Sequence, residues 1–434
     1  MKYLLMIFGL VIFFASLGYM IFRIVKFCKF SPLGGASPKI DEKERIYLIA
    51  LIIICGLASL LTNYGFVVMG NMPLAIGEHF SLIIGSLFFG ISFPLLISSF
   101  ALYYYRPDLD PKQRKMARIL TFVSIPFVFI GLWLFTNGMA DYMSYPLPNG
   151  LSFVEGFVTP GHGSGFTISF YGILVVSGGV SVYFIVDHKF YQKFGKHGLI
   201  DTLFIVSFLS GLIGARLWYC LVLEPKVYFA DPVRIFQVWD GGLGVMGGAL
   251  LGVAAGVTFV LVFRKYVNIR WAMDIIIPTI LIGQVIGRWG NFFNCEVYGM
   301  ESSISNWWFL PKVIMHNAQY SSSGAYLGDG LLHTPLFIIE SVINLCGYFI
   351  IRYAIGKPLK KYLALGDLAM CYFVWYGLVR VIMEPLRDGS FEYNTSWIIA
   401  FVLIGGGLLG ILAFHLYDFI RMKKGLPPRN LDTI

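Results

Sequence analysis

Residues 287–299 read Gly-Arg-Trp-Gly-Asn-Phe-Phe-Asn-Cys-Glu-Val-Tyr-Gly, and this polar run closes an otherwise apolar segment. Ionisable side chains cost about 2.5–3.5 kcal/mol each at the centre of a membrane helix, so they mark function where they approach hydrocarbon. Arg288 offers a forked donor that suits a phosphate, and Asn291 and Asn294 add neutral donors and acceptors. The structural alternative is a helix end that snorkels its arginine to the membrane interface.

The composition of the whole chain is that of an integral membrane protein. Of its 434 residues, 57% are hydrophobic and 13% are charged, with a mean hydropathy of +0.73, whereas a soluble domain carries about 25% charged residues. The net charge of +9 does not indicate nucleic acid, because the basic residues fall in short loops between apolar runs. Six cysteines are scattered without a CxxC pair, which predicts packing residues rather than disulfides, and no metal or organic cofactor is expected.

The apolar runs predict about eleven transmembrane helices, since a span needs about 20 apolar residues. Their number is odd, so the two chain ends are expected on opposite sides of the membrane. The predicted spans are 4–22, 47–69, 80–104, 117–137, 167–187, 201–223, 242–263, 274–288, 334–351, 364–383 and 396–418.

Lysine and arginine in the connections predict the orientation. The alternate connections at 70–79 and 138–166 hold none of these residues. By the positive-inside rule the N-terminus is therefore outside, and the C-terminus, with the tail 426–434, is cytoplasmic. The sequence thus predicts a multi-pass protein of the cell (cytoplasmic) membrane. The connections that hold 25 of the 33 basic residues are 23–46, 105–118, 188–198, 264–270, 352–361 and 421–429.

The chain divides into two predicted membrane parts. Residues 1–150 read as a four-span module of unassigned role, and residues 151–425 as a seven-span core. Within the core, the polar, Trp/Ser/Gly-rich segment 292–332 is expected to form a small extracytoplasmic insertion. The first span could be mistaken for a secretory signal, but its length and the basic residues that follow it favour an anchor.

Polar side chains of several core spans fall at one depth, near the outer head-group level. The tenth span carries Tyr376, Arg380 and Glu384 at i, i+4 and i+8, which places them on one helix face. Converging arginines with few carboxylates favour an anionic visitor, most simply a lipid phosphate reached from the side. The alternative is a structural network in which Arg380 and Glu384 neutralise each other. The other members of the set are Tyr171, Arg216, Arg288, Glu340 and Asn344.

A second glycine-rich run, Trp239-Asp240-Gly241-Gly242-Leu243-Gly244-Val245-Met246-Gly247-Gly248, opens the seventh span on the outer side. Glycines around one turn expose backbone that can press against an acyl chain. Close packing against a neighbouring helix would explain the same pattern.

The sequence resembles the bacterial prolipoprotein diacylglyceryl transferases at these residues. The family signature Gly-Arg-x-Gly-Asn-Phe-x-Asn-x-Glu-x-x-Gly is filled at every fixed place by residues 287–299. The likeness covers roughly residues 165–421 and leaves the first four spans outside. It is supported by Trp239-Asp240-Gly241-Gly242, Phe170-Tyr171-Gly172 and Tyr376-Gly377-x-x-Arg380-x-x-x-Glu384-x-x-Arg387.

The resemblance implies transfer of the diacylglyceryl group of phosphatidylglycerol to the lipobox cysteine of a prolipoprotein, at the outer leaflet. A thioether forms and glycerol phosphate leaves, and the partners are these substrates and membrane lipids. By the family's pattern Arg288 and Arg380 stabilise the phosphate, Glu384 orients Arg380 or transfers a proton, and Tyr376 lines the pocket beside them. The same resemblance, with the residues of matching depth, assigns substrate binding to Asn291, Asn294, Glu296, Gly299, Tyr171, Arg216, Gly241 and Gly242.

Two positions depart from the family's pattern. Many members carry a histidine, proposed as the thiol base, where this chain has Met246, and methionine cannot accept a proton. The family's His-Pro-x-x-Leu-Tyr-Glu-Ser segment appears at 333–341 with a threonine inserted after the histidine and isoleucine in place of the tyrosine. His333 stands at a depth where it could replace the missing base, although an interface or capping role is the commoner one for histidine.

Two rival functions are compatible with the same residues. An anionic-lipid transporter would also need buried arginines, but it should show inverted repeats and broken helices near the membrane midplane. No repeat links these spans. A non-catalytic lipid-binding scaffold is the second rival, which Met246 keeps open.

Overall fold

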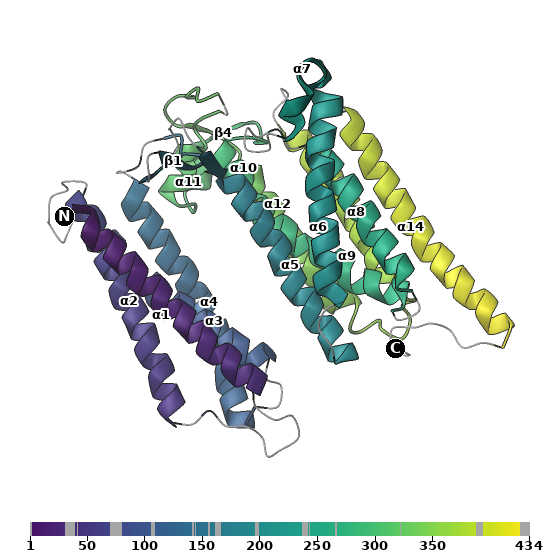
Figure 1. Ribbon diagram of the computed structural model, residues 1–434, viewed down its shortest axis with the longest axis horizontal. Coiled ribbons are helices and arrows are strands. Elements are labelled where there is room, and N and C mark those ends of the chain that lie inside the picture. The colour runs from purple at the N-terminus through teal and green to yellow at the C-terminus, as the bar shows by residue number, and fades with distance from the viewer. Residues whose placement is uncertain are drawn as a thin grey trace. The chain divides into compact units, whose positions relative to one another are not determined.

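The computed structural model describes residues 2–30, 40, 42–69, 80–105, 109–140, 143, 145–154, 157–160, 166–195, 199–236, 242, 244–264, 267–321, 323–387 and 394–425. The chain forms two compact units (Figure 1). The first comprises Met1–Tyr145 and Ser303–Asn317, and the second comprises Pro146–Ser302 and Ala318–Ile434. The first unit therefore includes part of the predicted extracytoplasmic insertion.

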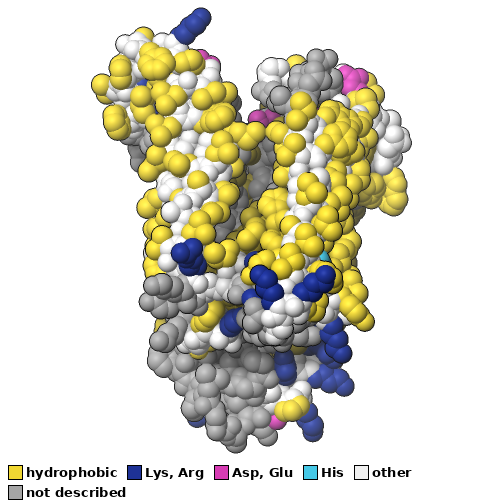
Figure 2. All heavy atoms as spheres, turned by 90° about the vertical axis from the view of Figure 1, so that its right-hand side faces the viewer, with side chains coloured by type: hydrophobic (Ala, Val, Ile, Leu, Met, Phe, Trp, Pro, Cys, Tyr) yellow, Lys and Arg dark blue, Asp and Glu magenta, His cyan; other side chains and the backbone are white. Residues whose placement is uncertain are grey.

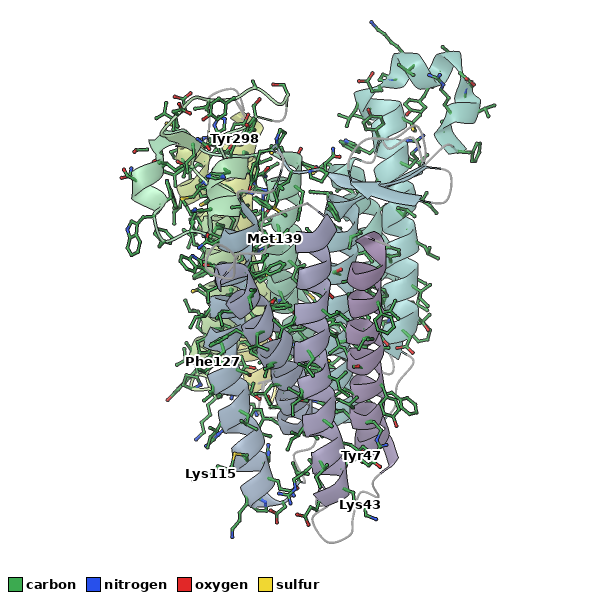
Figure 3. The ribbon with its side chains drawn as sticks, turned by 90° about the vertical axis from the view of Figure 1, so that its left-hand side faces the viewer. Lys43, Tyr47, Lys115, Phe127, Met139 and Tyr298 are labelled. Atoms are coloured by element: carbon green, nitrogen blue, oxygen red, sulfur yellow. The ribbon has the colours of Figure 1, made fainter. Side chains whose placement is uncertain are left out.

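Four long helices make up most of the first unit: α1 (Lys2–Phe30), α2 (Glu42–Met69), α3 (Phe80–Tyr105) and α4 (Pro111–Ala140). Glycines allow α3 and α4 to pack at backbone distance, since a Cβ built at Gly85 would lie 2.2 Å from the backbone nitrogen of Phe135. Figure 3 shows Lys43 and Lys115 at one end of this unit and Met139 near the other. This separation of charge is typical of helices that cross a membrane.

A short stretch of the later chain packs onto α4. It contains η4 (Ile304–Trp307) and α11 (Lys312–Asn317), which follow strand β4 (Glu301–Ser303). The backbone N–H of Lys312 donates to Oδ1 of Asn137 at 2.6 Å, and the rings of Tyr145 and His316 meet edge to face at 5.3 Å. Residues 303–317 thus belong to the first unit by contact, although the sequence places them within the core.

The second unit carries the remaining helices, arranged side by side (Figure 1). Two of its long helices continue as π-helical turns, and two short helices follow the end of α6. Its helices are α5 (Phe170–Phe194), α6 (Leu199–Trp218), η1 (Tyr219–Leu223), α7 (Pro225–Ala230), η2 (Pro232–Phe236), α8 (Val245–Val262), α9 (Ile269–Gly287), α10 (Trp289–Asn294), α12 (Leu336–Phe349), η5 (Ile350–Ile355), α13 (Asp367–Met383), η6 (Glu384–Leu386) and α14 (Asn394–Lys423).

Within the described residues, nine helices are long and apolar enough to cross a membrane. The first and seventh predicted spans coincide with the shorter apolar stretches Phe8–Ile24 and Met246–Val262. Hydrophobic side chains cover the sides of the helices, and Lys and Arg gather toward one end (Figure 2). The all-α membrane class is therefore confirmed, while the number eleven stays a prediction.

Two small sheets interrupt the helical pattern. Strands β1 (Gly150–Val154), β2 (Phe157–Pro160) and β3 (Phe166–Ser169) form an antiparallel sheet in the order β2-β1-β3, and β4 pairs with β5 (Leu331–His333). Strands β1 and β2 lie within residues 138–166, which the sequence predicts only as a connection between two spans.

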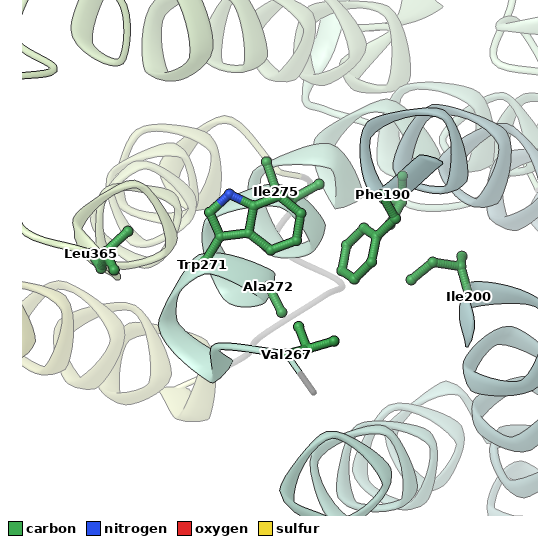
Figure 4. Close-up of a cluster of buried hydrophobic side chains, with 8 residues drawn as sticks. Phe190, Ile200, Val267, Trp271, Ala272, Ile275 and Leu365 are labelled. Atoms are coloured by element: carbon green, nitrogen blue, oxygen red, sulfur yellow. The ribbon is translucent and has the colours of Figure 1, made fainter. Parts of the chain in front are cut away.

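One end of the second unit has a core of buried hydrophobic side chains. Phe190 of α5, Ile200 of α6 and Trp271 of α9 converge there (Figure 4). Asp274 of α9 is fully buried, and its carboxylate accepts the backbone N–H groups of Gly366 at 2.7 Å and Ala369 at 3.0 Å. It therefore caps the start of α13 and locks it to α9. Arg380 lies on α13, and Arg288 directly follows α9.

The glycine-rich seventh span packs against α6. A Cβ built at Gly247 would lie 2.2 Å from the carbonyl oxygen of Gly214 and equally close to Cβ of Trp218. Helix packing, one of the two interpretations left open by the sequence, accounts for this glycine. Gly242 is described and has a positive φ of 73°, whereas Gly241 lies outside the described residues.

Candidate functional site

The signature run folds into a tight turn at the end of α9. After α10, Cys295 and Val297 adopt positive φ angles of 47° and 54°, which is unusual for residues other than glycine. The turn brings the carboxylate of Glu296 back to Asn291 and Asn294, whose side-chain amides each donate to Oε1 at 3.2 Å. Three of the predicted substrate-binding residues therefore form one hydrogen-bonded group.

Gly290 of the signature lies directly against Tyr171. A Cβ at Gly290 would sit 2.3 Å from Cδ2 of the tyrosine ring, so only glycine fits. By contrast, a Cβ at Gly287 would meet nothing within 4 Å. Tyr171 is held from its own side by the start of α5, where Ser169 caps the helix. The predicted neighbour relation between Tyr171 and the signature is thus present in the structure.

Arg288 is held by Glu340 of α12. Nη2 of the arginine lies 2.5 Å from Oε1 of the glutamate, and the two side chains are 17% and 4% exposed. Glu340 belongs to the polar set predicted at outer depth, and its role as the partner of Arg288 appears only in the structure. The pair joins α9 to α12 beside the signature turn.

Arg380 and Glu384 contact different partners: Arg380 contacts a residue of α13, and Glu384 contacts residues that follow α13. Nε and Nη2 of Arg380 donate to the hydroxyl of Tyr376 at 3.1 and 2.8 Å. Oε2 of Glu384 accepts the hydroxyl of Ser396 at 2.8 Å and lies 3.8 Å from Nη1 of Arg387. Ser396 was missed by sequence reasoning, because one hydroxyl in the first turn of an apolar span gives no signal.

These charged groups form one electrostatic cluster. Burial lowers the pKa of Arg387; the nearby charges of Arg380 and Arg288 lower it too, and Glu384 and Glu340 oppose them. We call Arg288, Arg380, Arg387, Glu340 and Glu384 the arginine cluster. Guanidinium groups outnumber carboxylates in it by three to two, which favours an anionic ligand.

The segment that begins at Gly299 is tied to the end of α13 next to the cluster. Gly299 pairs with Arg387 in an antiparallel bridge, and the N–H of Met300 donates to the carbonyl of Leu386 at 3.2 Å. A Cβ at Gly299 would lie 2.7 Å from that same carbonyl oxygen. The last glycine of the signature therefore permits close backbone pairing.

The two positions that depart from the family's pattern lie in different environments. His333 is buried at the end of β5, and its ring stacks on Tyr298 with centroids 3.8 Å apart and planes inclined by 27°. Met246 lies in the first turn of α8 and is 52% exposed. The stacking gives His333 a packing role that is independent of proton transfer.

The side chain of Arg216 forms hydrogen bonds with backbone carbonyl groups of the chain after α6. It is 5% exposed, and its guanidinium donates to the carbonyl oxygens of Arg234 at 2.6 Å, Ile235 at 2.9 Å and Gly242 at 3.1 Å. It also lies 5.2 Å from the ring centroid of Tyr228. These contacts fix the chain that follows α6.

No group of three or more His, Cys, Asp or Glu side chains is placed to hold a metal ion in the part of the chain that the structure describes. The donors and acceptors of the site are guanidinium, carboxylate, amide and phenol groups. They suit a phosphate and the hydroxyls of a polar head group.

Fold and site together define a multi-pass membrane protein with an arginine-rich polar site at one end of its helices. The sequence profile of the prolipoprotein diacylglyceryl transferases matches residues 162–413, which is more than half of the chain. The chain belongs to this family. The four helices α1–α4 lie outside the matched residues.

Several curated relatives of the chain are named as members of this family. The phosphatidylglycerol--prolipoprotein diacylglyceryl transferase of Mycoplasmopsis pulmonis is 36% identical over 227 residues, which cover 50% of this chain and 68% of the relative. That of Streptococcus uberis is 32% identical over 266 residues, 60% of this chain and 94% of the relative. That of Streptococcus agalactiae is 33% identical over 245 residues, 56% of this chain and 90% of the relative.

Proposed function

We propose that the arginine cluster binds the phosphate of phosphatidylglycerol and that the protein transfers its diacylglyceryl group to the lipobox cysteine of a prolipoprotein. The observation that carries this proposal is the meeting of Arg288 and Arg380 with Glu340 and Arg387, from three different helices and the turn after α13. Such a group has more cationic donors than its own carboxylates neutralise.

The reaction requires a leaving group to be stabilised. The cysteine sulfur attacks the glyceryl carbon that bears the phosphate ester, so a C–S bond forms and the C–O bond breaks. Glycerol phosphate leaves with the bonding electron pair, and the thiol gives up its proton. Guanidinium groups already in place where negative charge develops lower the barrier without reorganisation. We propose this role for Arg288, which pairs with Glu340, and for Arg380, which donates to the hydroxyl of Tyr376.

The remaining site residues are proposed to shape the pocket. Asn291, Asn294 and Glu296 would present amide and carboxylate groups to the glycerol hydroxyls, and Tyr171 would form the adjoining wall. Tyr376 would keep Arg380 aimed. Because Gly299 and Arg216 are engaged with backbone, we infer that they support the site through the segments they hold.

The thiol must be deprotonated, since its unperturbed pKa is near 8.5. Met246 has no group that could do this. The stacking of His333 on Tyr298 favours a role in packing the outer segment over a role as base. Glu384, which accepts a hydrogen bond from Ser396, is the alternative proton acceptor in the arginine cluster.

We infer that the site faces the outer leaflet, with the N-terminus outside and the C-terminus cytoplasmic. The concentration of lysine and arginine in alternate connections supports this orientation. The 1–150 module is proposed as an accessory membrane domain, and its helix α4 packs against α11.

The test uses the purified protein in lipid nanodiscs with labelled phosphatidylglycerol and a lipobox peptide. The expected product is a thioether on the peptide cysteine, identified by mass spectrometry. Arg288→Ala and Arg380→Ala should each lower its rate by at least about 10²-fold. Arg264→Ala is the matched control, because this arginine is exposed and follows the C-terminal end of α8.

Two results would overturn the proposal. Lipid that binds in an arginine-dependent manner but never reacts would indicate a scaffold. Lipid that moves between leaflets without thioether formation would indicate a transporter. Arg288→Lys should also be impaired, because lysine cannot reproduce the planar fork; a fully active lysine variant would contradict bidentate phosphate binding.

A further inference from the structure

Two short helices follow the end of α6 and project beyond it (Figure 1). They are α7 (Pro225–Ala230) and η2 (Pro232–Phe236), and we call them the α7–η2 hairpin. The apolar stretch that contains α6 ends at Leu223, and the next apolar stretch begins at Met246. The hairpin therefore lies at the level where the chain leaves the hydrocarbon region.

The hairpin exposes large apolar side chains. Phe229, Val233 and Phe236 are 71%, 68% and 78% exposed. Inside a membrane-spanning helix such exposure is expected, because lipid covers the side chain. In the hairpin, the exposed apolar side chains lie on helices that are too short to span a membrane, immediately after a span has ended. Such a surface indicates a site that binds a protein or a membrane.

The hairpin is held in a defined orientation. Arg216, buried at the end of α6, donates to the carbonyls of Arg234 and Ile235, and its guanidinium packs on the ring of Tyr228. These contacts occupy one face of the hairpin. Its apolar side chains are consequently presented by a fixed scaffold.

Charge on the hairpin does not identify a polar partner. Lys226 and Arg234 are balanced by Asp231 and by Glu224, which directly precedes α7, and Nε of Arg234 lies 3.6 Å from Oδ2 of Asp231 as an exposed ion pair. With no net charge there is no long-range attraction to an anionic surface. Apolar area is what remains to drive association, and the medium at this level is the boundary between head groups and acyl chains.

We propose that the α7–η2 hairpin is an interfacial anchor that inserts Phe229, Val233 and Phe236 into the leaflet in which α6 ends. Its ligand is the upper acyl region of phospholipids of any head group. Side chains of this kind enter about 5–10 Å into the boundary region. The anchor does not rest on the transferase activity, and it assigns Arg216 the task of setting the hairpin's angle.

The experiment places an environment-sensitive fluorescent amino acid at position 229, 233 or 236, one at a time, in the full-length protein in phosphatidylcholine nanodiscs. The expected result is a blue-shifted emission, strong quenching by phospholipids brominated near the ester end of the chain, and a Stern–Volmer constant for iodide several-fold lower than at Asp231. The label at Asp231, on the same hairpin and 57% exposed, is the matched control.

Equal iodide quenching at Phe229, Phe236 and Asp231 would overturn the proposal, because the hairpin would then lie in water. Protection from both iodide and brominated lipid would overturn it as well, since a protein surface would then cover the hairpin. Replacing half of the lipid with phosphatidylglycerol should leave the quenching unchanged. A strong increase in quenching by brominated lipid after this replacement would contradict insertion driven by apolar area. The label is tested at three separate positions, so the result does not depend on a single label that disturbs folding.

Discussion

Nη2 of Arg288 lies 2.5 Å from Oε1 of Glu340, and the pair bridges α9 and α12. The glutamate side chain is 4% exposed. The pair therefore fixes the guanidinium before any lipid arrives, and the carboxylate occupies part of the donor surface that a phosphate would use. Binding would replace Glu340 as the partner of Arg288, and the charge of the phosphate would be balanced by the guanidinium group that the two carboxylates leave unneutralised.

We expect Glu340→Gln to destabilise the lipid-free protein by about 3–5 kcal/mol, because loss of one partner leaves a buried charge uncompensated. Anionic phosphatidylglycerol should restore much of this loss, and zwitterionic phosphatidylcholine should restore little. Thermal unfolding of the variant in each lipid measures the difference. Glu301→Gln, at an exposed site on β4, is the control. Equal stabilisation by both lipids would contradict the exchange of partners.

The signature glycines provide a second prediction. Gly290→Ala should destabilise the protein by about 1–3 kcal/mol, because the added methyl group overlaps the ring of Tyr171. Gly287→Ala, three residues away, should be neutral or slightly stabilising, since alanine favours a helix by about 1 kcal/mol. The unfolding temperature and the transfer rate should both be lower for Gly290→Ala than for Gly287→Ala. Equal tolerance at both positions would show that Tyr171 moves freely.

We expect Met246→His to remain active, with a change of less than about threefold, or roughly 0.7 kcal/mol. Position 246 is half exposed in the first turn of α8, so an imidazole fits without displacing neighbours. Steady-state transfer to a lipobox peptide measures the effect. A large loss would mean that the site has been rebuilt around the methionine. A large gain would mean that the missing base limits the native rate.

Arg216→Gln separates two roles for this residue. If it acts by holding the α7–η2 hairpin, the variant should lose about 3 kcal/mol of local stability, because three carbonyls lose a charged donor. Hydrogen exchange of residues 225–236 should then accelerate, while KM for phosphatidylglycerol changes little. A raised KM with unchanged exchange would instead assign Arg216 to substrate binding.

The pairing of residues within the site was the part that sequence could not supply. The i, i+4 spacing predicts that Tyr376 and Arg380 are neighbours on one helix face, which their hydrogen bonds show, whereas Glu384 begins η6 after the end of α13. It could not show that Arg380 bonds to Tyr376 while Glu384 turns to Ser396 and Arg387. These choices depend on the side-chain rotamer and on which neighbouring helix offers a partner.

By itself the sequence determined the membrane class, the helical segments and the residues of the signature. It can do so because hydrocarbon imposes length and apolarity on each span, and because an arginine near it is too costly to be accidental. Only the tertiary structure decided that Glu340 holds Arg288, that Gly290 accommodates Tyr171, and that Arg216 supports backbone. These relations join residues that are far apart in the chain, and their energies depend on distances of a few ångströms that no periodicity encodes.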